Sequence, residues 1–305
     1  MTSIEKLKVR DALMQSIRAF FHSEGFVEVE TPIRMRTPCM ELHIDAEPSG
    51  DLWLRTSPEL YHKKLLAEGA QKIFEIGKCF RQGECGDRHH PEYTMLEWYR
   101  AGGDYNVMLG DLQRLLAAVG RVTSPGGTSD DWKIFTIAEV YEEFAGWNPV
   151  ENFDADRFDF DMVEKIEPNL PKDAPVILED YPAECCALAR LKPDNPKVAE
   201  RWELYLGGIE IANAYSELTD PDEQRARFEK WGAQRKALGK IVYPIDEEFI
   251  RCLKKMPPSG GCALGIDRLL MAVTGATTLD DILPFRDLLS PVGEELNVPL
   301  RSLER

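Results

Sequence analysis

The stretch GGCALGIDRLLMAV, residues 260–273, combines residue types that could bind a phosphate group. It holds three glycines within six residues, and glycine-rich turns that lead into helices often cradle phosphates. No Lys-Ser or Lys-Thr pair follows the last glycine, and the spacing does not fit a dinucleotide-binding fingerprint. Arg268 stands at the start of an expected helix, where a cation is normally unfavourable, which indicates an anionic ligand beside it. The glycines alone are also explained by close packing of a strand end.

A second candidate site lies in residues 73–100, where the strand-like runs IFEIGKCFR and YTMLEWYR flank a polar loop, QGECGDRHHPE. This pattern predicts a long hairpin. The loop and the strand ends carry two arginines and two histidines that matter here: Arg81, Arg88, His89 and His90. Arginine suits bidentate phosphate contacts, protonated histidine is a hydrogen-bond donor, and Tyr93 could stack on a base. The alternative is a solvated loop whose tyrosines belong to the core.

Polar side chains on predicted strands form the third candidate. Glu97 and Tyr99 are two residues apart on one strand, so they face the same side. The strand-like segment 201–218 carries further oxygen ligands: Glu203, Glu210, Asn213 and Glu217. Buried carboxylates are uncommon unless they are paired or functional, and oxygen ligands are what magnesium prefers. A solvated strand face is the alternative, although the neighbouring Gly207, Gly208, Leu204, Ile209 and Ile211 argue against simple exposure. His43 and His62 are given no functional role.

The elements that must position these residues follow from periodicity and turn signals. Residues 4–24 have the apolar spacing of an amphipathic helix, and FVEVETPIRM, residues 26–35, alternates like a strand. From residue 52 a strand, a turn and a helix follow, with Ser57 suited to the N-cap and Pro58 to an early helical position. Further helices are expected at 106–120 and 221–239, a strand and then a helix at 260–275, a loop or linker at 122–132, and a mixed pattern at 133–197.

The order of these elements is not a βαβ alternation, which disfavours a doubly wound parallel sheet. We expect an α+β fold in which a mostly antiparallel sheet is flanked by helices. The chain is expected to form one domain, residues 1–305, with a helical insertion or variable region at about 120–175.

Composition narrows the classes of function. The chain has 305 residues, 43% of them hydrophobic, and a net charge of −16, so it lacks the overall basic footprint of a nucleic-acid-binding protein, although a local basic patch remains open. No apolar run approaches the ~20 residues of a membrane helix, and the charged N-terminus does not fit a signal peptide. The seven cysteines are scattered and form no CxxC motif, which disfavours a disulfide framework or a zinc site and predicts a cytoplasmic location.

Taken in order, three stretches resemble the signature of the class II aminoacyl-tRNA synthetases. GFVEVETP resembles motif 1, which implies a homodimer with Pro32 at the interface; FRQGECGDRHHPEYTMLEWYR resembles motif 2; and GGCALGIDRLLM resembles motif 3. TSPELYHKKLL, RHHPEYTMLEWY and GGIEIANAYSELTDPDEQRARF are similar to segments of the lysyl type. The resemblance covers residues from about 5 to 285 and is weak only around 120–175.

Two features differ from a lysyl-tRNA synthetase. Motif 1 begins near residue 25, so we expect no N-terminal OB-fold domain for the anticodon. LEWYR, and Ala263 where lysyl-tRNA synthetases typically have glycine, resemble a stand-alone paralogous family. That resemblance implies activation of (R)-β-lysine with ATP and Mg²⁺ and its transfer to a lysine side chain of elongation factor P, a translation factor shaped like tRNA, without tRNA binding.

Two alternatives stay open. One is a truncated lysyl-tRNA synthetase-like enzyme that activates α-lysine for tRNA or another acceptor. The other is a catalytically inactive paralogue serving as a binding subunit, which is disfavoured because four residues that such paralogues tend to lose are present: Arg81, Glu203, Glu210 and Arg268.

The resemblance also implies roles for individual residues at the nucleotide end of a site. Arg81 is expected to hold the ATP α-phosphate, and Arg268 to stack on the adenine and lie near the γ-phosphate, so these two carry the catalysis. Tyr93 should stack on the other face of the adenine, and Gly265 should let the nucleotide approach the backbone. Glu203 and Glu210 are the expected magnesium ligands. Further nucleotide contacts are expected from Gln82, Gly83, Glu84, Arg88, His89, His90 and Ile211.

At the other end, three glutamates are expected to ring the amino groups of the substrate: Glu59, Glu97 and Glu217. The same pocket is expected to include Ser57, Pro58, Tyr99, Asn213 and Ala263. One position departs from the motif 2 pattern Phe-Arg-x-Glu, because Gly83 stands where glutamate is usual. Glu84 or the backbone is therefore expected to make the adenine contact. Such a site acts mainly by positioning the reactants and stabilising charge.

Overall fold

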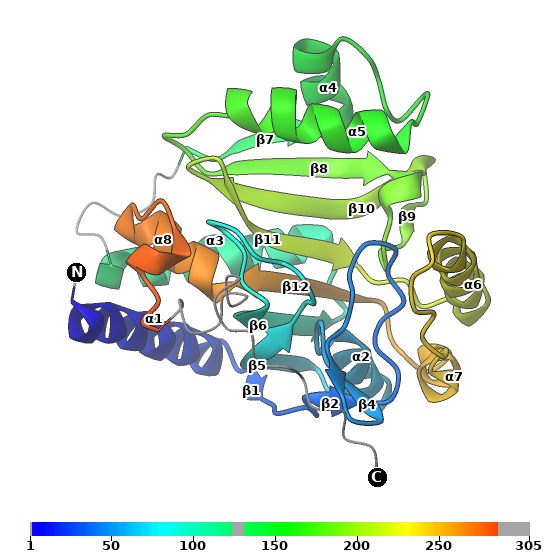
Figure 1. The fold of residues 1–305 in the computed structure, drawn as a ribbon, viewed down its shortest axis with the longest axis horizontal. Helices are drawn as coiled ribbons and strands as arrows, with labels where there is room; N and C mark the ends of the chain where they lie inside the picture. The colour runs from blue at the N-terminus through cyan, green and yellow to red at the C-terminus, as the bar shows by residue number, and fades with distance from the viewer. Residues whose placement is uncertain (1, 124–130, 286–305) are drawn as a thin grey trace, which may run out of the picture.

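A large mixed sheet positions the candidate residues (Figure 1). The structure is a computed structural model that describes residues 2–123 and 131–285. Within these ranges the sheet has nine strands, in the order β1-β5-β6-β12-β11-β10-β8-β7, with β9 paired to β10. The strands are β1 (Val27–Glu28), β5 (Lys72–Phe80), β6 (Glu92–Ala101), β12 (Ser259–Gly265), β11 (Ile209–Ser216), β10 (Asn195–Leu206), β9 (Leu191–Lys192), β8 (Val176–Pro182) and β7 (Lys133–Thr136). The pairs β1–β5 and β7–β8 are parallel and the other pairs are antiparallel, which confirms the expected mostly antiparallel α+β fold.

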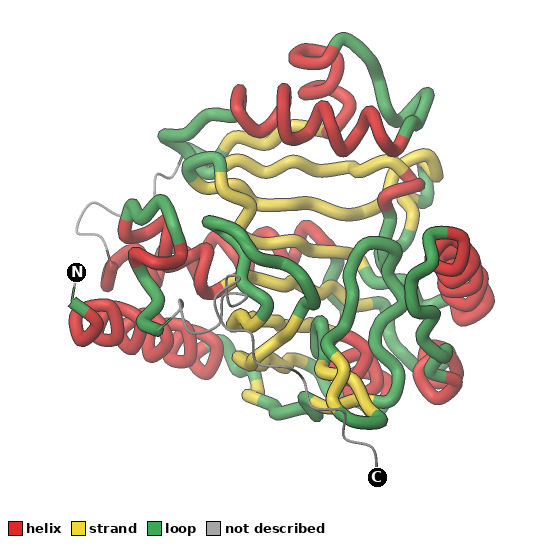
Figure 2. Tube along the Cα trace, in the orientation of Figure 1, coloured by secondary structure: helices red, strands yellow, loops and turns green. Residues whose placement is uncertain are grey.

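Helices surround this sheet, as the red segments of Figure 2 show around the yellow strands. They are α1 (Ser3–Ser23), α2 (Glu59–Ala67), α3 (Tyr105–Thr123), α4 (Ile137–Ala145), α5 (Ala155–Asp161), α6 (Pro221–Ala237), α7 (Glu247–Leu253) and α8 (Ile266–Thr274). A small second sheet has the order β2-β4-β3, from β2 (Arg34–Met35), β3 (Pro48–Ser49) and β4 (Leu52–Leu54). In the part of the chain that is described, no helix is long and apolar enough to cross a bilayer.

The main core lies behind the sheet. Helix α3 crosses behind β11 and β12 in Figure 1, and helices α1 and α8 pack beside it. Alternate residues of the central strands, such as Leu96 and Trp98 on β6 and Leu264 on β12, are fully buried in this core. Because side chains alternate between the two faces of a strand, the residues between them point to the opposite face, where the candidate site lies.

Helix α1 has a capping box at its start and the buried apolar face that the sequence of residues 4–24 predicts. Thr2 and Glu5 form a capping box that satisfies the first backbone N–H groups of the helix. Leu13, Ile17 and Phe21 then repeat at helical spacing and are completely buried against the main core. The predicted helix at 4–24 is therefore confirmed.

Two expected strands have a different structure. In the stretch 26–35 only two short segments pair, β1 with β5 and β2 with β4, and residues 29–33 between them are not in a strand. The stretch 201–218 is a hairpin rather than one strand, since β10 and β11 meet at Gly207 and Gly208. Both glycines have positive φ, 60° and 77°, which a turn of this kind requires and which glycine adopts without steric cost.

The region expected to be a helical insertion also contributes strands to the sheet. Helices α4 and α5 lie at the top of Figure 1, above β7 and β8, which extend the main sheet at that edge. Short alternating strands with a helix between them are poorly distinguished by periodicity alone, so the mixed pattern of 133–197 did not reveal them. Of the expected linker at 122–132, positions 124–130 lie outside the described residues.

Candidate active site

A cavity of about 430 Å³ opens on the face of the sheet opposite α3. Most of the residues singled out from the sequence line it: Ser57, Glu59, Arg81, Glu84, Arg88, His89, His90, Tyr93, Glu97, Tyr99, Glu203, Glu210, Ile211, Asn213, Glu217, Ala263, Gly265 and Arg268. Three expected residues, Pro58, Gln82 and Gly83, are not among the lining residues. The three stretches considered separately in the sequence therefore converge on one site.

The three residues that do not line the cavity are held by backbone structure. The N-cap of α2 is Pro58, one residue after the expected Ser57. The Ser57 hydroxyl still accepts a hydrogen bond from the Glu59 N–H at 3.0 Å. Gln82 donates its backbone N–H to the Asp45 carbonyl, 2.7 Å away. Gly83 has a φ of 78°, so it makes a turn that a glutamate would adopt only with strain.

One cross-strand row forms the floor of the cavity. Glu75, Glu97, Ala263, Asn213 and Glu203 are successive partners across β5, β6, β12, β11 and β10. Directly paired residues project to the same face of a sheet, with Cβ atoms about 4.5–5.5 Å apart. The methyl group of Ala263 therefore lies between the side chains of Glu97 and Asn213.

A parallel row lies beside the first. Tyr99, Gly261, Tyr215 and Arg201 are successive partners across β6, β12, β11 and β10, and all four line the cavity. A Cβ atom at Gly261 would lie 2.2 Å from Glu217 Oε1 and 2.3 Å from Tyr99 Cε1, closer than any real contact. Glycine at this position is thus required by the two side chains that cross over it.

A bulge brings Glu210 to the same face as Asn213. The register of β10 against β11 shifts between Leu204 and Tyr205, which pair with Ala212 and Glu210 respectively and leave Ile211 as the extra residue. A bulge of this kind reverses the alternation of faces for the residues beyond it. As a result Glu210 points into the cavity, where strict alternation from Asn213 would have turned it into the core.

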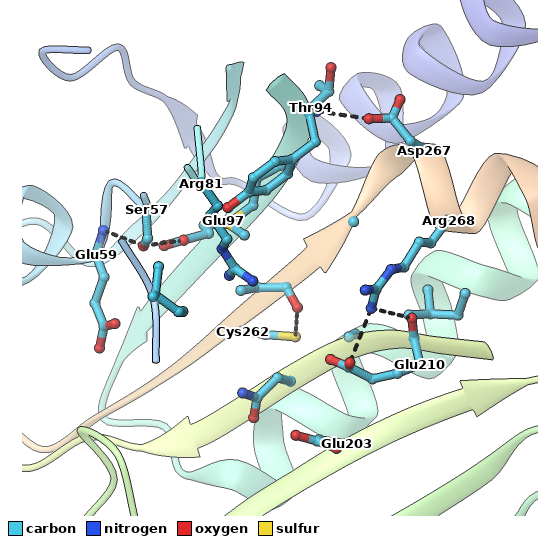
Figure 3. Close-up of a pocket in the computed structure, with 18 of the residues that line it drawn as sticks. Ser57, Glu59, Arg81, Thr94, Glu97, Glu203, Glu210, Cys262, Asp267 and Arg268 are labelled. Carbon is cyan, nitrogen blue, oxygen red and sulfur yellow. Dashed lines mark hydrogen bonds and ion pairs between the residues drawn. The ribbon is translucent and has the colours of Figure 1, made fainter. Parts of the chain in front are cut away.

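One end of the cavity is a network around Glu97. The Ser57 hydroxyl donates to Glu97 Oε1 at 2.6 Å, and the Tyr99 hydroxyl donates to Glu97 Oε2 at 3.1 Å. Figure 3 shows Ser57, just before α2, pointing toward Glu97, with Glu59 beside it. Glu97 and Glu217 are almost completely buried. A concentration of carboxylates this deep is costly unless cations or hydrogen-bond donors meet it, so the pocket is suited to a ligand that carries ammonium groups.

The opposite end is built around two arginines. Arg268, at the start of α8, donates to Glu210 Oε2 at 3.0 Å and to the Glu210 carbonyl at 3.2 Å (Figure 3). It also contacts His89 Nε2 at 2.5 Å. The helix dipole makes a cation unfavourable at the N-terminus of α8, and the Glu210 carboxylate offsets part of this cost. The guanidinium of Arg81 stands 5.2 Å from the centroid of the Tyr93 ring. Partial burial and the neighbouring Arg268 lower the pKa of His89, so its ring is neutral near pH 7 and Nε2 accepts from Arg268.

Glu203 and Glu210 face one another across the β10–β11 hairpin. Glu203 is held by the Tyr181 and Tyr205 hydroxyls, which donate at 2.6 Å and 3.0 Å, and by an ion pair with Arg201 at 2.5 Å. Burial and the negative charge of Glu203 raise the pKa of Glu210, and Arg268 acts in the opposite direction. Two carboxylates in mutual repulsion could supply two of the oxygen ligands that a Mg²⁺ ion prefers. Among the residues described, no group of three or more His, Cys, Asp or Glu side chains could enclose a metal.

His62, which was given no role, is completely buried behind Glu97. Its Nε2 lies 3.0 Å from Glu75 Oε2, and its Nδ1 lies 3.5 Å from Glu97 Oε2. Burial opposes the charged ring, but Glu75 and Glu97 outweigh it and raise the pKa of His62. Arg55 pairs with Glu75 at 2.6 Å, so a buried chain of charged groups supports Glu97 from behind. No sequence spacing reveals this chain, because α2, β5 and β6 meet only in the fold.

Other cavity residues were missed although a local signal existed. Tyr215 and Arg201 are two positions from Asn213 and Glu203 on the same strands, so strand alternation places them on the same face. Lys63 does not itself line the cavity, but it is one helical turn after Glu59 and pairs with it at 2.7 Å. Glu41, on the segment between β2 and β3, also lines the cavity, and burial raises its pKa to about 7.

Comparison with known proteins gives one consistent result. The family described as tRNA synthetases class II (D, K and N) matches residues 2–288. The chain is 35% identical to the elongation factor P–(R)-β-lysine ligase of Haemophilus influenzae strain PittGG, over 92% of this chain and 95% of that protein. It is also similar to proteins of the same name from Pasteurella multocida strain Pm70, at 35% identity over 93% and 95%, and from Vibrio vulnificus strain YJ016, at 34% over 93% and 96%.

Proposed function

Because this chain belongs to the class II tRNA synthetase family of the D, K and N types, we propose that it is an ATP-dependent ligase that joins (R)-β-lysine to a lysine side chain of elongation factor P. The proposal is supported by the names of relatives that align over nearly their whole length. The observation that carries it is the cavity itself, in which the glutamates near α2 and the arginines Arg81 and Arg268 lie at two ends of one space.

The first step forms an adenylate. An oxygen of the substrate carboxylate attacks the α-phosphorus of ATP, and pyrophosphate leaves. In this proposal Arg81 holds the α-phosphate and Arg268 meets the outer phosphates, where their fixed charges offset the charge that develops; both residues line the cavity. Glu203 and Glu210 would hold Mg²⁺, which supplies charge neutralisation on the phosphates. Fixing both reactants in this cavity removes much of the entropic cost of the reaction.

The second step transfers the amino acid. The unprotonated amine of the acceptor lysine attacks the carbonyl carbon of the adenylate, a C–N bond forms, and AMP leaves with the electrons of the C–O bond. The same cavity serves both steps because the adenylate stays bound between the glutamate network and Arg81. The network of Ser57, Glu97 and Tyr99 holds the amino groups of the activated substrate away from the reacting carbonyl.

Two measurements test the proposed reaction. ATP–pyrophosphate exchange is expected with (R)-β-lysine at a higher kcat/KM than with α-lysine. Incubation with elongation factor P, ATP and (R)-β-lysine is expected to increase the mass of one lysine-containing peptide by one lysyl residue. A clear preference for α-lysine together with charging of tRNA would instead support a truncated lysyl-tRNA synthetase-like enzyme.

The motif 1 resemblance supports a homodimer as part of the same proposal. Pro32 and Ile33 are exposed in the segment that joins β1, the edge strand of the main sheet, to β2. Exposed apolar groups beside a sheet edge suit an interface between two copies. Sedimentation equilibrium is expected to give twice the mass of the chain, and an Ile33→Asp variant is expected to shift this mass toward that of one chain.

Ala263→Gly is expected to shift the substrate preference toward α-lysine. The methyl group of Ala263 stands between Glu97 and Asn213, so its removal widens the pocket where the two lysine isomers differ in the position of an amino group. A difference of one methyl group is worth roughly 1–3 kcal/mol, so the ratio of kcat/KM values should change about 10-fold or more. This ratio is measured by ATP–pyrophosphate exchange with (R)-β-lysine and with α-lysine.

Ala101→Gly is the matched control, because Ala101 lies at the far end of the neighbouring strand β6 and does not line the cavity. It should lower stability by the usual cost of glycine in a strand without changing the isomer ratio. An unchanged ratio in Ala263→Gly would exclude this residue as a determinant of specificity.

A further inference from the structure

Lys63 is a completely buried ammonium group at the amino-acid end of the cavity. It lies on α2, and its Nζ is 2.7 Å from Glu59 Oε1 and 2.6 Å from Glu217 Oε2. Burial disfavours the charged form, but the two carboxylates outweigh it and raise the pKa of Lys63. The reaction steps described above make no use of this cation.

Glu217 is the second part of the arrangement. Its side chain is buried, and Oε1 accepts no hydrogen bond from any described residue. Oε2 faces Lys63, whereas Oε1 lies over Gly261, where a Cβ atom would come within 2.2 Å. A buried carboxylate oxygen without a donor is costly, so a donor from the ligand is expected at Oε1.

We propose that Lys63 is a positioning residue that keeps Glu217 ionised and aimed at an ammonium group of the substrate. Glu59, held by the same ammonium, is oriented with it. The inference rests on the proposed function, because it takes the ligand of this pocket to be a diamino acid. It assigns to Lys63 a role in substrate affinity rather than in the chemical step.

The physical argument concerns the charge of Glu217. Burial raises the pKa of Glu217 above its usual range, Lys63 opposes this, and the nearby Glu59 reinforces it. The direct 2.6 Å contact makes the ionised pair the resting state. The other titratable groups that face this pair are Glu97 and Tyr99 on β6, Cys262 on β12, Cys39 between β2 and β3, and Cys252 on α7. None of them is a cation, so without Lys63 the Glu217 carboxylate would gain a proton.

Lys63→Met tests the proposal because methionine keeps the length of the side chain and removes the charge. At about pH 7, the KM for (R)-β-lysine in pyrophosphate exchange is expected to rise roughly 30-fold or more, with kcat changed less than about 3-fold. The raised pKa of Glu217 means that its carboxylate returns as the pH rises. Because loss of Lys63 raises this pKa further, KM of the variant should fall only as the pH becomes alkaline, and at a higher pH than any change in the wild-type enzyme.

Lys64→Met is the matched control. Lys64 is the next residue of α2 and also pairs with two acids, Asp246 at 2.8 Å and Glu248 at 2.9 Å, but these acids do not line the cavity, whereas Glu59 and Glu217 do. Its KM and pH profile should equal those of the wild-type enzyme.

A double variant separates positioning from a merely structural role. If Lys63 acts through Glu217, Glu217→Gln should raise KM at every pH, and adding Lys63→Met to it should raise KM little further. A pH-independent loss of kcat and KM together in Lys63→Met, or fully additive effects in the double variant, would overturn the inference. A wild-type enzyme that exchanges with neither lysine isomer would contradict the proposed function itself, whereas normal exchange with an unaffected Lys63→Met contradicts the Lys63 inference alone.

Discussion

Arg268→Ala is expected to reduce ATP–pyrophosphate exchange by roughly 10²–10³-fold, mainly through kcat, because loss of one preorganised donor to a developing anion typically has this effect. Arg268 connects three parts of the site: the start of α8, Glu210 on β11, and His89 in the hairpin loop. Its removal withdraws a cation from the phosphates and leaves Glu210 without its ion-pair partner. Exchange kinetics at saturating lysine isomer and ATP measure the effect.

Two further variants make this experiment specific. Arg251→Ala removes an exposed arginine from α7, outside the cavity, and should leave exchange unchanged. Arg268→Lys keeps the charge but loses the planar guanidinium that can donate two parallel hydrogen bonds. It should therefore be more active than Arg268→Ala but less active than the wild-type enzyme. Exchange by Arg268→Ala at the wild-type rate would show that the phosphates do not bind at this end of the cavity.

Gly261→Ala is expected to abolish activation of the amino acid while ATP binding persists. The added methyl group would lie 2.2 Å from Glu217 Oε1 and 2.3 Å from Tyr99 Cε1, so both side chains would have to move. Displacing both side chains disrupts the surface that receives the ammonium groups, so exchange should fall about 100-fold or more. Calorimetry with ATP and exchange with the lysine isomers measure the two properties separately.

Gly110→Ala is the control for this variant. Gly110 lies in α3, where a Cβ atom would meet only Arg114 Nη1 at an ordinary 3.6 Å, and alanine stabilises a helix relative to glycine by about 1 kcal/mol. It should retain full exchange and raise Tm. If Gly261→Ala folds with a native Tm and retains wild-type KM, the amino acid does not bind over this row of the sheet.

Local patterns were sufficient for several parts of the site. The hairpin 73–100 alternates regularly, so the sequence predicts that Glu97 and Tyr99 share a face, and they are hydrogen-bonded in the cavity. The change from a glycine-rich strand to a helix at 265–266 places Gly265 and Arg268 at the cavity, as expected. These features depend on neighbours within one or two elements, which periodicity describes well.

Relations between distant segments required the fold. The bulge at Ile211 decides that Glu210 and Asn213 share a face, and its position depends on the register of β10 against β11. Ala263 acquires its neighbours Glu97 and Asn213 only when β12 inserts between β6 and β11. Strand order of this kind is set by burial over the whole sheet, which no single segment encodes.

The sequence by itself determined which residue types are available for binding phosphates and amines, and the order in which they occur along the chain. Only the tertiary structure decided which of them are buried and how they are paired. Lys63 and His62 read as ordinary helix residues in the sequence, yet both are completely buried among carboxylates. The physical reason is that the charge state and orientation of a buried group depend on its neighbours in space, and these come from α2, β5, β6 and the segment after β11 together.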